Sequence, residues 1–191
     1  MFRLFTVVLC LVLGGCAFTV HDVQTNYHYS APVSSRLPAK RIGVGAFSDE
    51  RGVQNPRLIM NIRNLNGDTT SGGWQAEKPI SELLRDGIIQ GLTSAGVTTQ
   101  PSVGALALKG QLLDFNVKTI MGMWEGTLEG KMTVKFQLTN ASTGAVVWQD
   151  TFIGSSQVKG GEGAVGVLKA TLDNVVTKFL SDEYFQQKLA E

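Results

Sequence analysis

From residue 124 to residue 138 the sequence alternates in a way that suits only one kind of backbone. Every even position is apolar or glycine: Trp124, Gly126, Leu128, Gly130, Met132, Val134, Phe136 and Leu138. The odd positions include charged and amide side chains, among them Glu125, Glu129, Lys131, Lys135 and Gln137. Because side chains alternate between the two faces of a strand, this pattern predicts a long antiparallel strand with one buried and one solvated face.

The residues on either side of this strand extend the same sheet. Residues 140–144 are typical of a turn, and residues 146–152 carry the apolar face onward in a returning strand. Upstream, residues 106–112 alternate in one phase and residues 113–117 alternate in the opposite phase. Such a change of phase predicts a β-bulge near Leu112–Leu113.

Two other stretches have the period of an amphipathic helix. The first begins at Pro79 and ends at Gly96, because proline suits a first turn and glycine suits a left-handed cap. The second covers residues 165–179, and a short terminal helix follows it after a cap at residues 181–183. With a strand at residues 41–47, we predict an α/β (α+β) fold. Its mainly antiparallel, twisted sheet has four to five strands, with the amphipathic helix and the C-terminal helix packed on one face.

Residues 48–78 form a long polar insertion, and a structureless loop of that length is uncommon in a compact domain. Residues 58–62 and 69–74 suit two strands, and Asn66-Gly67 between them is a strong hairpin signal. We therefore predict a β-ribbon insertion, although a decorated loop with a packed tryptophan remains the plainer alternative. The candidate partner contacts on the ribbon are Arg57, Arg63 and Trp74.

The N-terminal residues have the organisation of an export signal. Arg3 precedes the apolar residues 4–13, which as a helix would rise about 15 Å across a hydrocarbon core of about 30 Å. The segment is therefore expected to be cleaved rather than retained as an anchor. The sequence Leu13-Gly14-Gly15-Cys16 resembles the lipobox of bacterial lipoproteins. That resemblance implies cleavage before Cys16, a diacylglyceryl thioether on its sulfur and an acylated amino group; an ordinary secretory signal or a buried N-terminal strand are the alternatives.

Three parts are predicted along the chain. Residues 1–15 are the signal peptide, residues 16–40 are the lipidated cysteine with a flexible tether, and residues 41–191 are a single periplasmic α/β domain. Both histidines, His21 and His28, lie in the tether. Together with Asp22 they form a conceivable metal set, but solvated tether residues are the interpretation we favour, so no metal is expected.

Charge and cysteine content narrow the function. Residues 1–15 contain one basic and no acidic residue, so their removal leaves equal numbers of Lys/Arg and Asp/Glu. A nucleic-acid partner is not expected, because such proteins need a basic face. Cys10 leaves with the signal, Cys16 would carry lipid, and no histidine is available for a catalytic triad in the domain. We expect no enzymatic activity and no cofactor.

Several segments together resemble the YajG-like family of Gram-negative lipoproteins. They are the run from Ile80 to Val97, Leu106-x-Leu108-x-Gly110-x-Leu112, Thr143-Gly144-x-x-x-Trp148 and Leu180-Ser181-Asp182-x-x-Phe185. No catalytic residue is attributed to that family, so the resemblance implies none here. By analogy with lipoprotein sorting, Ala17 after the cysteine implies the outer membrane.

Taken together, these features predict an outer-membrane lipoprotein that faces the periplasm. Acyl chains on Cys16 would hold it to the membrane, and the domain would dock an envelope protein. The alternative is a small-ligand or lipid-binding protein with an apolar groove between sheet and helices. Gly126 and Gly130 favour that alternative, because they leave space on the apolar face.

Overall fold

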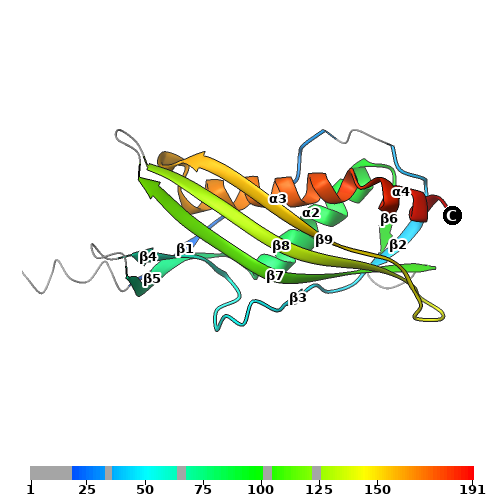
Figure 1. Cartoon of the computed structure of the whole chain (residues 1–191), viewed down its shortest axis with the longest axis horizontal. Coiled ribbons are helices and arrows are strands. Elements are labelled where there is room, and N and C mark those ends of the chain that lie inside the picture. The colour runs from blue at the N-terminus through cyan, green and yellow to red at the C-terminus, as the bar shows by residue number, and fades with distance from the viewer. Residues whose placement is uncertain (1–18, 33–35, 64–67, 101–104, 122–125) are drawn as a thin grey trace, which may run out of the picture.

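The computed structural model describes residues 19–32, 36–63, 68–100, 105–121 and 126–191. The export signal, Cys16, the Asn66-Gly67 turn and Trp124 lie outside these residues. Figure 1 shows an elongated molecule whose long strands run along its longest axis, with the C terminus at one end. Among the helices in the described ranges, none combines the length and apolarity needed to cross a membrane.

The larger sheet has the strand order β6-β2-β7-β8-β9, with β3 paired to β7. The bounds are β2 Arg41–Val44, β3 Ser48–Asp49, β6 Thr98–Gln100, β7 Leu106–Met121, β8 Gly126–Asn140 and β9 Val146–Lys159. The long strands pair antiparallel, β7 with β8 and β8 with β9. Strand β2 pairs in parallel with both β6 and β7, and β3 pairs in parallel with β7. The prediction of one sheet with four to five mainly antiparallel strands is therefore only approximate. Strand β2 was predicted, but β3 and β6, with two and three residues, are too short for an alternation to be recognised in the sequence.

The long strands confirm the alternation and the bulge. On β8 the even positions from Leu128 to Leu138 are buried, and most of the odd ones are at least partly exposed. On β7, Leu112 pairs with Val134 and Asp114 pairs with Thr133, so Leu113 is the extra residue. Its side chain is 37% exposed because the bulge turns it away from the core.

In the described part of the chain, three α-helices accompany the sheet: α2 Ile80–Ser94, α3 Gly163–Leu180 and α4 Glu183–Ala190, with a 3-10 turn, η2 Gly160–Glu162, before α3. Gly96 ends α2 at φ +97°, and Val97 N donates to Leu92 O at 2.9 Å, which is the bonding of a left-handed cap. At the start of α4, Asp182 Oδ1 accepts from Phe185 N at 2.6 Å. Both predicted caps are confirmed.

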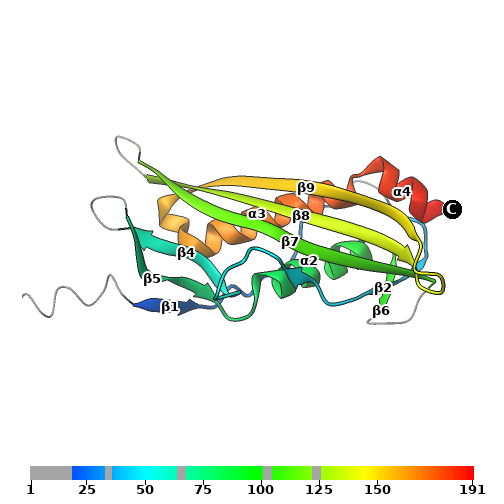
Figure 2. The same cartoon turned by 60° about the horizontal axis from the view of Figure 1, so that its bottom comes forward.

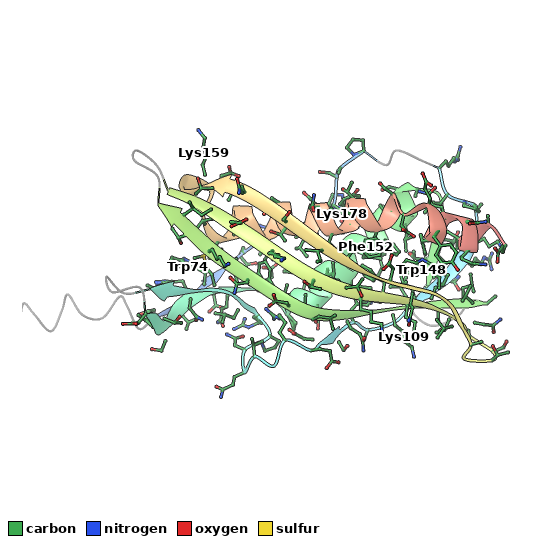
Figure 3. All side chains as sticks on the ribbon, in the orientation of Figure 1. Trp74, Lys109, Trp148, Phe152, Lys159 and Lys178 are labelled. Atoms are coloured by element: carbon green, nitrogen blue, oxygen red, sulfur yellow. The ribbon has the colours of Figure 1, made fainter. Side chains whose placement is uncertain are left out.

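Helices α2 and α3 cover one face of the larger sheet, as Figures 1 and 2 show. Two glycines on that face allow α3 to approach closely. A Cβ on Gly130 would lie 2.2 Å from Thr171 Oγ1, and one on Gly154 would lie 2.3 Å from Val175 Cγ2. Toward the C-terminal end, rings with centroids 4.5–6.1 Å apart fill the same interface. They belong to Phe136, Trp148, Phe152, Phe179 and Phe185, and Figure 3 labels two of them.

A second, smaller sheet has the order β1-β5-β4. Strands β4 Leu58–Arg63 and β5 Thr69–Ala76 are antiparallel, which confirms the predicted ribbon. Strand β1 Val20–Val23 adds to it in parallel, in a region predicted to be tether. The prediction of a flexible tether is wrong for the described residues 19–32, because they pair with β5 and then pack on the helices.

Candidate functional site

The N-terminal segment from residue 24 to residue 32 crosses the outer side of α2 and α3 and is bonded to both. Thr25 donates from its N and Oγ1 to Glu77, at 2.9 and 2.6 Å. Tyr27 Oη donates to Asp173 Oδ1 at 3.0 Å, and Tyr29 N donates to Gln90 Oε1 at 2.6 Å. We call residues 24–32 the strap.

One glycine on α2 makes room for the strap, and another makes room for α3. A Cβ on Gly87 would lie 2.8 Å from Tyr27 Cε1. A Cβ on Gly91 would lie 2.7 Å from Leu180 Cδ1 of α3, with Tyr29 Cδ1 in ordinary contact at 3.4 Å. The exposed fractions of the two tyrosines are 9% and 3%. Because these rings and their hydroxyl groups are buried against α2 and α3, the strap belongs to the core rather than to a linker.

The strap places two carboxyl groups in contrasting surroundings. Burial by itself raises the pKa of Glu77, but hydrogen bonds from Thr25 bring it below its ordinary value. Burial raises the pKa of Asp173, against the hydrogen bond from Tyr27 and the charge of Lys169. The pKa of Tyr27 is raised by burial and then by the negative charge of Asp173, so its hydroxyl stays a donor.

A polar network lies where β1 meets the ribbon, and it is centred on Asp22. Asp22 Oδ1 accepts from Gln75 Nε2 at 2.9 Å and lies 3.2 Å from Arg57 Nη1. Asn55 Nδ2 donates to Gln75 Oε1 at 2.7 Å, and Asn55 Oδ1 accepts from Arg57 N at 3.0 Å. The Asp22 and Arg57 side chains stay 62% and 36% exposed, so this network forms part of the surface.

Arg51 binds both ends of the loop that leads into β4. Its Nη2 lies 2.6 Å from Asp49 Oδ2 and donates to Pro56 O at 2.8 Å, and the arginine side chain is only 4% exposed. Burial opposes ionisation of Asp49, but hydrogen bonds and charge from Arg51 lower its pKa overall. These bonds fix the loop that carries Asn55 and Arg57, which belong to the network around Asp22.

The structure brings two of the predicted partner contacts to the same small sheet. Arg57 binds Asp22, and the Trp74 ring lies 6.2 Å from the His21 ring, between centroids. Trp74 is half-buried and packs against the main core. Arg63 is the last residue of β4, next to residues that are not described.

The conceivable metal set is not brought together. His21 contacts Trp74, Asp22 binds Arg57 and Gln75, and His28 follows on the strap beyond β1. Within the described ranges there is no group of three or more His, Cys, Asp or Glu side chains suited to a metal ion. The lipobox residues Leu13, Gly14 and Gly15 and the lipid site Cys16 lie outside the described residues.

The observation that favoured a ligand groove has another explanation. The space over Gly130 is filled by α3, since a Cβ there would lie 2.2 Å from Thr171 Oγ1 and 2.8 Å from Val167 Cγ2. A Cβ on Gly126 would lie 4.0 Å from Ile120 O, in ordinary contact. An open depression of about 820 Å³ does occur near the C terminus, where Lys40, Arg41, Asn140 and Lys188 are among its lining residues, but none of its lining residues belongs to α2 or α3.

Sequence reasoning missed the strap. Thr25, Tyr27 and Tyr29 are buried and alternate with exposed residues. That period of two was present in the sequence, but Pro32 and Pro38 and the absence of a longer apolar run favoured a linker. The signal that would have identified the strap is a pair of tyrosines at i and i+2 in a polar segment.

The fold has known counterparts. It is similar to that of XCC0632 from Xanthomonas campestris, a DUF330 protein, with TM-score 0.64 and 15% identity over 88% of this chain and 95% of that chain. CT253 from Chlamydia trachomatis, a hypothetical protein, gives TM-score 0.52 and 6% identity over 81% and 100%. At these identities the likeness shows a shared fold. No protein-family model and no curated protein matches the sequence, so membership of the YajG-like family stays a prediction.

Proposed function

We propose that this protein is a non-enzymatic lipoprotein, anchored in the outer membrane by acyl chains on Cys16 and facing the periplasm. The observation that carries the proposal is the sequence Leu13-Gly14-Gly15-Cys16 directly after an apolar run too short to span a bilayer. Two or three acyl chains, at about 0.8 kcal/mol per buried CH₂, make such attachment effectively permanent. Ala17 and the YajG-like segments support the outer membrane as its place.

The domain docks an envelope protein through the surface around Asp22. There Arg57 is partly exposed, and Trp74 presents an aromatic ring that is only half-buried. Arginine and tryptophan are enriched at protein interfaces, because each combines a large contact area with polar bonding. Because Arg51 fixes the loop that carries Arg57, less entropy is lost when this surface binds a partner.

The anchor is tested by labelling cells with radioactive palmitate. Wild-type protein is expected to incorporate the label and to be cleaved before Cys16, whereas a Cys16→Ser variant incorporates none. Label that persists in the variant would show that the lipid is elsewhere.

The docking surface is tested by a photo-crosslinking residue placed at Arg57 and, as a matched control, at the exposed Gln149 on β9. Crosslinks in intact envelopes are expected to a defined protein from position 57 and not from position 149. Equal crosslinking at both positions, or none at 57, would refute docking at this surface.

A further inference from the structure

We propose that the end of the domain where β1 begins lies directly against the lipid bilayer that holds the acyl chains. The inference rests on the proposed lipid at Cys16 and adds the orientation of the domain to it. A protein on a long tether would sample the periplasm freely. The structure leaves this chain almost no tether.

The chain between Cys16 and β1 is short. Ala17, Phe18 and Thr19 alone separate Cys16 from the first residue of β1, Val20. Four residues of extended chain span at most about 14 Å. A flexible linker of residues 16–40 would instead have a root-mean-square reach of roughly 25–30 Å.

Strand β1 is held in place by its pairing with β5. Val20 lies in register with Gly73 and Val23 with Ala76, and Gly73 N also donates to Thr19 O at 3.2 Å. Beyond β1, the strap is bonded to Glu77, Gln90 and Asp173, as described above. Freeing β1 would break its pairing with β5, and freeing any chain beyond it would break the buried contacts of the strap.

The short chain also limits where the bilayer lies relative to the fold. Thr69, the first residue of β5, precedes Gly73 by as many residues as Cys16 precedes Val20. Cys16 therefore reaches at most about as far along the small sheet as the start of β5. In Figures 1 and 2 the starts of β1 and β5 lie at the end of the molecule opposite the C terminus.

The groups exposed at this end suit a bilayer surface. Val20 and Ile120 are 38% and 44% exposed, and the Lys118 and Lys159 side chains are also exposed. Apolar side chains and lysines are both favourable at the interface of anionic lipids. Asp68 and Glu162 are exposed there too, so tether length rather than net charge determines the contact.

Single cysteines allow a direct test, because Cys10 leaves with the signal and Cys16 becomes a thioether. We place one fluorophore at Thr69→Cys and, in a separate protein, one at Ala141→Cys in the β8–β9 turn at the opposite end. Both side chains are exposed and small. Strand β8 alone, with 15 residues, separates the two ends by about 50 Å. The lipidated proteins are inserted in phosphatidylethanolamine–phosphatidylglycerol vesicles that contain a headgroup-linked quencher.

The expected result is quenching several-fold stronger at position 69 than at position 141. Insertion of twenty Gly/Ser residues between Phe18 and Thr19 is expected to reduce quenching at position 69 toward that at 141. Equal quenching at the two positions, or an insertion without effect, would overturn the proposed orientation. Flotation with the vesicles is measured separately, because wild-type protein that fails to float refutes the lipid anchor and not the orientation.

Discussion

Replacing Gly130 by alanine tests whether α3 is seated on the sheet as closely as described. The new Cβ would lie 2.2 Å from Thr171 Oγ1 and 2.8 Å from Val167 Cγ2, both in a helix that cannot shift without disturbing its neighbours. Thr171 and Val167 are fully buried, so neither side chain can swing into solvent. Overpacking of a core by one methyl group costs about 1–3 kcal/mol, and we expect about 2 kcal/mol here.

The assay is reversible denaturation by urea and by heat of the chain from residue 17 onward. For a domain of this size, a loss of about 2 kcal/mol lowers the melting temperature by about 4–8 °C. The matched control is Gly161→Ala in η2, because a Cβ there meets nothing within 4 Å. We expect that variant to stay within about 0.5 kcal/mol of wild type.

A second substitution tests whether Thr171 is the side chain that the new methyl group contacts. Thr171→Ala removes the atom closest to the new Cβ, together with its bonds to Ser156 Oγ at 2.7 Å and Val167 O at 2.6 Å. The double variant with Gly130→Ala is expected to be about 1 kcal/mol more stable than the sum of the single effects predicts. Gly130→Ala with wild-type stability, or exact additivity in the double variant, would refute close packing at this point.

Three further predictions concern the strap and the last helix. Tyr27→Phe removes the bond to the partly buried Asp173 and is expected to cost about 1 kcal/mol of unfolding free energy, measured with urea. Because hydrogen bonds from Thr25 lower the pKa of Glu77, their contribution is present at neutral pH and is lost as the pH falls through that lowered pKa. Stability measured from about pH 5 to about pH 3 should therefore fall more steeply in wild type than in Glu77→Gln, and parallel curves would contradict this. Asp182→Ala removes the cap of α4 and should cost about 1 kcal/mol, with faster amide exchange confined to α4; unchanged exchange there would show that the cap is not needed.

The elements with a long period could be predicted from the sequence. The alternation of β8, the bulge at Leu113 and the caps at Gly96 and Asp182 are local features that few neighbouring residues specify. A strand was predicted at residues 41–47, but the parallel pairing of β2, β3 and β6 within one sheet could not be. Each is two to four residues long, and its pairing depends on partners far along the chain.

In the candidate site, too, local features could be predicted from the sequence, whereas contacts between distant segments could not. Arg57 and Trp74 were identified on a ribbon, but the strand that completes the ribbon, β1, was not. Three of its four residues are exposed, so no pattern of buried and exposed positions marks it in the sequence. The strap carried a weak signal in Tyr27 and Tyr29, but their burial depends on contacts with α2 and α3, which lie far along the chain.

The sequence by itself determined where strands and helices with a long period lie, and it predicted Cys16 as the lipid site. Those properties follow from side-chain period and from a short local motif. Only the tertiary structure decided that residues 19–32 are part of the fold, because their partners come from β5, α2 and α3. A lipid at Cys16 would therefore be joined to the fold by a very short stretch of chain and not by a long flexible tether.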